Sequence, residues 1–196
     1  MGSEMCIRDS CEAGDHVVLS STVYGGTFNL LAVTMKKMGV SCTVVDPDAD
    51  YETICKAFQP NTKCVMAESL ANPALVVLDF EKFARAAHAH HVPLIVDNTF
   101  PTPINCNPFK WGVDIVTHST TKYMDGHAMA LGGAIVDLRP YAAKLEWPVG
   151  IGTKHVQDAS YPFLIQEKYR AGYFTHYAGE GTVRLSLIHI SESTRP

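Results

Sequence analysis

Residues 97–100 read DNTF and residues 119–123 read STTKY, and each of these polar stretches follows a short, mostly apolar run, the first directly and the second after His118. The runs are residues 93–96 (PLIV) and residues 114–117 (DIVT). Short β-branched runs bounded by polar turns are typical of buried strands. In a mostly parallel sheet the ligand site lies beyond the carboxyl ends of the strands, so both polar stretches are expected at one edge, beside the site.

On both sides of these stretches, short apolar runs alternate with segments of helical spacing. Helices are predicted at residues 28–38, 51–58 and 79–91, the last with Asp79 as its N-cap. Strands are predicted at residues 16–20, 42–45, 63–68, 93–96, 114–117 and 133–136. This order predicts an α/β fold, a mostly parallel sheet with helices on both faces. From residue 138 to residue 184 the pattern weakens and indicates only a linker followed by a helix.

Composition excludes several classes of protein. The 196 residues are 46% hydrophobic and 18% charged, which is typical of a globular protein. A net charge of -4 gives no reason to expect nucleic acid or a membrane as partner, and no apolar run approaches the roughly 20 residues of a membrane span. The six cysteines form no CxxC pair, so a cytoplasmic protein with reduced thiols and no metal is expected.

The two ends of the chain carry inverse copies of one DNA element. Residues 5–10 read MCIRDS and residues 185–190 read LSLIHI, and the reverse complement of a DNA encoding of the first begins an encoding of the second. The element resembles a transposon end used in sequencing libraries. Residues 1–10 and 185–196 are therefore expected to be foreign to the protein, which would continue beyond both; coincidence is the alternative.

Four residues in the two polar stretches together fit one cofactor chemistry. Lys122 could condense with an aldehyde, which requires that part of the amine be deprotonated. Ser119 and Thr121 could donate hydrogen bonds to a phosphate, and Asp97 could hold a ring nitrogen in its protonated form. Taken singly, Asp97 could be a turn or N-cap aspartate and Lys122 a solvated loop lysine.

Four motifs together resemble the Cys/Met-metabolism family of pyridoxal 5'-phosphate (PLP) enzymes. They are YGGT at 24–27, ESLANP at 68–73, DNTF at 97–100 and STTKY at 119–123. The resemblance implies PLP as cofactor. It also implies a fold like the large domain of fold-type I (aspartate aminotransferase-like) enzymes, truncated at both ends. Residues 11–137 would be part of this PLP-binding domain, and residues 138–184 its poorly defined continuation.

The resemblance also assigns roles to residues. Lys122 would be the Schiff-base lysine and Asp97 the partner of the pyridinium nitrogen, while Ser119 and Thr121 would bind the phosphate. Tyr24 would stack on the cofactor ring and assist proton transfer. Asn72 would lie near the cofactor hydroxyl and the substrate carboxylate. The alternatives are a turn tyrosine before two glycines and a simple Asn-Pro turn.

Residues 68–79 and 126–134 look most like O-acetylhomoserine sulfhydrylase. The implied reaction is γ-replacement on O-acetylhomoserine by sulfide or a thiol, which gives homocysteine or methionine plus acetate. A γ-lyase or cystathionine synthase or lyase is the first alternative, and a non-catalytic scaffold with the PLP-enzyme fold is the second. The resemblance also implies that the intact protein is a dimer or tetramer, with an N-terminal arm and a C-terminal domain that carries an arginine for the substrate carboxylate. The 196-residue chain alone is expected to bind PLP weakly and to be inactive.

Overall fold

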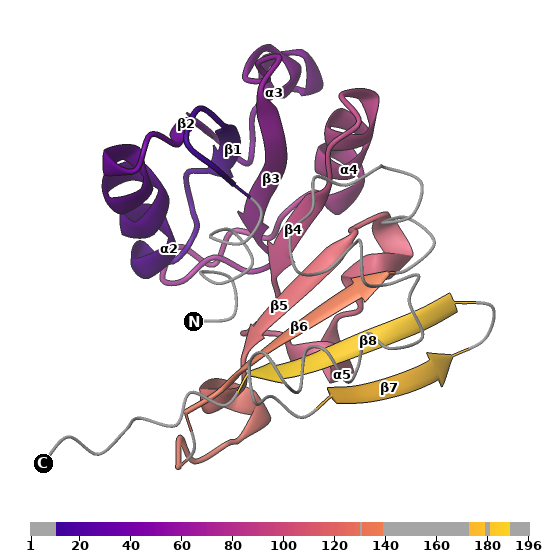
Figure 1. Cartoon of the computed structure of the whole chain (residues 1–196). Coiled ribbons are helices and arrows are strands. Elements are labelled where there is room, and N and C mark those ends of the chain that lie inside the picture. The colour runs from indigo at the N-terminus through magenta and orange to yellow at the C-terminus, as the bar shows by residue number, and fades with distance from the viewer. Residues whose placement is uncertain (1–10, 130, 139–172, 179–180, 189–196) are drawn as a thin grey trace, which may run out of the picture.

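The computed structural model describes residues 11–129, 131–138, 173–178 and 181–188, which build one twisted sheet with helices packed against it (Figure 1). The strand order is β2-β1-β3-β4-β5-β6-β8-β7. Strands β1 to β5 pair in parallel, whereas β6, β8 and β7 are antiparallel to their neighbours. The predicted mostly parallel sheet is therefore confirmed. The strands are β1 His16–Ser20, β2 Ser41–Val45, β3 Thr62–Glu68, β4 Leu94–Asp97, β5 Ile115–Ser119, β6 Gly133–Leu138, β7 Tyr173–Ala178 and β8 Gly181–Ile188.

The predicted helix after residue 138 is absent from the described part of that segment. Residues 173–178 and 181–188 are strands, and residues 183–188 of β8 pair with β6. Their sequences, YFTHYA and GTVRLSLI, are rich in aromatic and β-branched residues, which favour strands where an unpaired sheet edge offers partners. The other residues of this segment lie outside the described part. Residues 185–188 belong to β8. That they are foreign to the protein stays a prediction, because strand pairing does not test where a segment comes from.

Three predicted helices are present, with shifted ends. The first comprises α2 (Gly25–Asn29) and continues directly into η1 (Leu30–Met35), so it begins three residues earlier than predicted. The second and third are α3 (Tyr51–Lys56) and α4 (Phe80–Ala89). Each has an aspartate N-cap, because Asp50 accepts the Thr53 amide at 2.7 Å and Asp79 accepts the Lys82 amide at 3.0 Å. The shorter elements are α5 (Thr102–Asn105), η2 (Pro108–Trp111) and η3 (Thr120–Met124).

Alternation along the strands divides the core into two layers, one on each face of the sheet. Val18, Val65, Val96 and Val116 face one layer, which also contains apolar residues of α3 and α4 such as Phe83. The intervening residues face the other layer, which η1 covers with Leu31 and Met35. They are Val17, Leu19, Cys64, Met66, Ile95 and Ile115. Helices thus cover both faces, as predicted (Figure 1).

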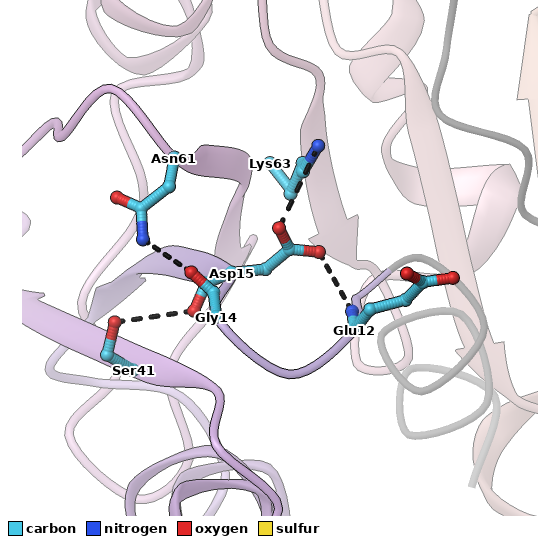
Figure 2. Close-up of polar contacts among 6 residues, drawn as sticks. All are labelled: Glu12, Gly14, Asp15, Ser41, Asn61 and Lys63. Carbon is cyan, nitrogen blue, oxygen red and sulfur yellow. Dashed lines mark hydrogen bonds and ion pairs between the residues drawn. The ribbon is translucent and has the colours of Figure 1, made fainter.

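Polar contacts fasten the amino end of the sheet, the edge opposite the predicted site (Figure 2). Asn61 donates its amide to the Gly14 carbonyl at 2.6 Å, and the Ser41 hydroxyl donates to the Asp15 carbonyl at 3.3 Å. The Asp15 carboxylate also lies 3.8 Å from the Lys63 ammonium. These contacts join the start of β1 to β2 and β3. Among the described residues, no helix is both long enough and apolar enough to cross a membrane.

Candidate active site at the carboxyl edge of the sheet

The ends of β4 and β5 are joined through one threonine. Asp97 ends β4, and its Oδ1 accepts the backbone N–H of Thr99 at 2.9 Å. The hydroxyl of Thr99 in turn accepts the N–H of Ser119, the last residue of β5, at 2.8 Å. Because β4 and β5 pair in parallel with Asp97 opposite Thr117, the DNTF and STTKY stretches lie side by side. The expected meeting of these two stretches is confirmed.

Several polar side chains follow the apolar ones on the sheet face that η1 covers. On β3, β4 and β5 this face contains Met66, Ile95 and Ile115. Side chains of a strand alternate between the two faces, so the residues two positions later, Glu68, Asp97 and Thr117, extend from the same face. Ser119 follows by the same rule. The register pairs Glu68 with Asp97 and Asp97 with Thr117, which makes a polar row across three strands.

The turn that contains Lys122 is fixed by its neighbours. Thr121 is buried, and its hydroxyl accepts the Gly132 N–H at 2.9 Å and contacts the Gly132 carbonyl at 3.4 Å. The Thr120 N–H donates to the same carbonyl at 3.0 Å. Lys122 itself is exposed. These bonds hold the two residues that precede Lys122 against the segment leading into β6, while the Lys122 side chain remains accessible.

Tyr24 and Asn72 lie on loops at this edge. Tyr24 immediately precedes α2, and its backbone forms a hydrogen bond with the Glu68 carboxyl group, which places it beside the polar row. Its side chain is 57% exposed. Asn72 is exposed in the loop after β3, between the bridged residues Leu70 and Val77. The structure therefore brings the backbone of Tyr24 to Glu68, the register partner of Asp97. Asn72 makes no side-chain hydrogen bond with a described residue.

Unpaired buried atoms concentrate at this edge. Within the described residues, the buried side-chain atoms without a hydrogen-bond partner all belong to residues within two positions of the carboxyl ends of β3, β4 and β5. They are Glu68 Oε2, Asn98 Oδ1, Thr117 Oγ1 and His118 Nδ1. Native proteins pair most buried polar atoms, because an unpaired one costs about 1–3 kcal/mol. Such a concentration is typical of a site that binds a polar ligand.

Burial and the charge of Asp97 perturb two neighbouring groups. Burial, together with the negative charge of Asp97, raises the pKa of Glu68 to about 8, although the hydrogen bond with Tyr24 opposes this. Burial lowers the pKa of His118, while Asp97 and a hydrogen bond with the backbone of Asn98 oppose that shift. Perturbed titrating groups at one sheet edge are typical of active sites.

A sequence profile described as Cys/Met metabolism PLP-dependent enzyme matches residues 1–164. The chain belongs to this family. An O-acetyl-L-homoserine sulfhydrylase of Leptospira meyeri is 45% identical over 133 residues, which are 68% of this chain and 30% of that protein. An L-methionine gamma-lyase of Treponema denticola is 39% identical over 148 residues, 74% of this chain and 36% of the relative.

A solved structure from Campylobacter jejuni, described as an O-acetylhomoserine (thiol)-lyase carrying a pyridoxyl-lysine monophosphate, has a TM-score of 0.70 and 36% identity. The match covers 74% of this chain and 35% of that one. The chain therefore spans about a third of the length of the relatives it matches. These structural relatives are fold-type I enzymes, as the sequence resemblance implies.

PLP is the cofactor of this family, and the carboxyl edge of the sheet fits it. PLP has a basic ring nitrogen, a ring hydroxyl and a phosphate, and the edge offers an anion in Asp97, hydroxyls in Ser119 and Thr121, and an accessible amine in Lys122. The unpaired buried atoms beside Asp97 agree with a polar ligand there. Thr117 was not predicted from the sequence as a site residue. The signal for Thr117 was a hydroxyl in an apolar strand, two residues before Ser119.

Proposed function

We propose that the chain is part of a PLP-dependent enzyme that catalyses γ-replacement on O-acetylhomoserine. Sulfide or a thiol replaces the acetate, and the products are homocysteine or methionine plus acetate. The observation that carries the proposal is the hydrogen-bonded link from Asp97 through Thr99 to Ser119, beside the accessible Lys122. The similarity to the Leptospira meyeri sulfhydrylase supports the choice of reaction.

Each proposed site residue has a definite task. Lys122 would hold the cofactor through its Nζ atom, and the same nitrogen would move the α-proton of the substrate. The Asp97 carboxylate keeps the ring nitrogen protonated, and Thr99 orients this carboxylate by donating its amide to Oδ1. PLP, when bound, supplies the electron sink that makes the proton removals possible.

The remaining residues bind and orient. Ser119 and Thr121 donate hydroxyl hydrogen bonds to the phosphate, and Thr121 can do so by giving up its long 3.4 Å contact with Gly132. Tyr24 covers the ring and relays a proton through its phenol oxygen. Asn72 binds the ring hydroxyl and the substrate carboxylate. We propose that the intact enzyme is a cytoplasmic dimer or tetramer.

Borohydride trapping tests the cofactor assignment. PLP added to the chain should give a visible absorption band that borohydride removes, and peptide mass spectrometry should then find a reduced pyridoxyl group on Lys122. The Lys122→Ala variant should lose both signals, whereas Lys110→Ala, at another exposed lysine, should keep them. Labelling of Lys110 in place of Lys122, or no labelling at all, would refute the assignment and favour the non-catalytic scaffold.

A γ-lyase is the second candidate, because the Treponema denticola methionine gamma-lyase matches almost as well. Product analysis separates the two on the protein encoded by the uninterrupted gene. A sulfhydrylase given O-acetylhomoserine and sulfide forms homocysteine and acetate, whereas a lyase releases a 2-oxo acid and ammonia without sulfide. Release of 2-oxobutanoate at an equal rate with and without sulfide would contradict γ-replacement.

A further inference from the structure

Glu68 is the carboxylic acid next to Asp97 in the polar row. The two residues are register partners on the parallel strands β3 and β4, so their side chains extend from the same face of the sheet. Neighbouring strands lie about 4.8 Å apart, which brings the two carboxyl groups close together. Glu68 is only 6% exposed, and its Oε2 has no partner among the described residues. Water therefore screens the Glu68 carboxyl group poorly.

No cation compensates Glu68 within the described residues. The groups that face it are the Asp97 carboxylate on β4 and the backbone amide of Tyr24 before α2. The amide alone offsets the effects of burial and of Asp97 only in part, which is why the pKa of Glu68 rises to about 8. Beside the Asp97 carboxylate the buried Glu68 carboxyl group is most stable with its proton, so the pair then carries one proton and one negative charge.

We infer that Glu68 is a positioning residue that holds one proton, so that Glu68 and Asp97 together present a single negative charge to the ring nitrogen of the cofactor. This inference rests on the proposed function. Glu68 acts through Asp97: as a neutral acid it stays beside the carboxylate without repelling it. The bound pyridinium cation favours the ionised form of Glu68, so cofactor binding and loss of the Glu68 proton should promote each other.

Carbon-13 NMR of side-chain carboxyl groups tests the pair in the ligand-free chain. The Glu68 signal, identified by its loss in Glu68→Gln, should titrate with a midpoint near pH 8. Asp97→Asn removes the neighbouring charge and should lower this midpoint by about one unit or more, whereas the charge-conserving Asp97→Glu should keep it raised. Thr117→Val, on the other side of Asp97, is the matched uncharged control and should leave the midpoint in place.

Adding PLP itself gives the second measurement. Binding, detected by the visible band, should lower the Glu68 midpoint by about one unit, because the cationic ring stabilises the carboxylate. Glu68→Gln, which resembles the neutral acid, should bind PLP at pH 7 about as well as the wild type. Its affinity should lose the dependence on pH that Glu68 contributes, a change that a purely structural residue would not cause.

The outcomes separate this inference from the proposed function. A ligand-free Glu68 midpoint in the ordinary range of glutamate, or one unmoved by Asp97→Asn, overturns the inference. A visible band with an unmoved Glu68 midpoint also overturns it, because Glu68 then does not respond to the ring. Failure of PLP to bind, with the ligand-free titration as expected, contradicts the proposed function and leaves the shared proton of the carboxyl pair established.

Discussion

Replacing Glu68 by glutamine should stabilise the fold, and the gain should grow with pH. Because the pKa of Glu68 is raised from 4.5 to about 8 by folding, the folded state favours the protonated acid. The contribution of Glu68 to stability is then fully present below pH 4.5 and is lost as pH rises through 8. Glutamine has the shape of the protonated acid and cannot ionise, so the variant avoids this loss.

The size of the gain follows from the difference between the two pKa values. Each pKa unit corresponds to about 1.4 kcal/mol once the group is ionised in both states. Proton linkage then predicts that Glu68→Gln raises the free energy of unfolding by about 1 kcal/mol at pH 5, about 3 kcal/mol at pH 7 and about 5 kcal/mol at pH 9. Burial of Glu68, only 6% exposed, limits screening by solvent.

Urea unfolding of the wild type and Glu68→Gln at pH 5, 7 and 9 measures this gain directly. Glu52→Gln, at an exposed position in α3, is the matched control and should change the free energy of unfolding by less than about 0.5 kcal/mol at each pH. If the difference between the wild type and Glu68→Gln is the same at all three pH values, Glu68 does not titrate differently in the folded chain, and the reasoning fails.

Three further substitutions test the packing and the backbone by urea unfolding at pH 7. Phe83→Ala should cost about 3–5 kcal/mol because this side chain is completely buried between α4 and the sheet, and a loss under about 1 kcal/mol would contradict the assigned core. Asp79→Ala should cost about 1 kcal/mol by removing the cap of α4, whereas Asp79→Ser should restore most of it. Gly112→Ala should cost more than Gly126→Ala. Both have positive φ, but a Cβ at residue 112 would lie 3.2 Å from the Ala84 Cβ, whereas residue 126 has open space; equal losses would refute the contact.

The sequence predicted the sheet well because strand alternation carries its signal locally. Runs such as residues 93–96 are short, apolar and bounded by polar turns, and the strand there ends within one residue of the expected place. Strand direction has no such signal, since an antiparallel strand alternates as a parallel one does. The antiparallel pairing of β6 with β5 therefore had to come from the structure.

The start of the first helix and the late strands were missed for other reasons. Residues Gly25 and Gly26 form the first turn of α2, although the low helix propensity of glycine predicts a later start. Strands β7 and β8 form on the edge that β6 offers, so their structure depends on a partner distant in the sequence. Local patterns could not show either effect.

The same distinction explains how far the site could be predicted. Asp97 and Ser119 could be placed at one edge because each ends a recognisable strand. The hydroxyl of Thr99 that joins them depends on the register of β4 against β5, and a shift of one residue would turn Asp97 to the opposite face. The register is fixed by buried pairs such as Ile95 with Ile115, two positions before Asp97 and Thr117 on their strands. The core of the sheet thereby determines which polar groups meet. A substitution that shifts the register should abolish PLP binding without touching a proposed cofactor residue.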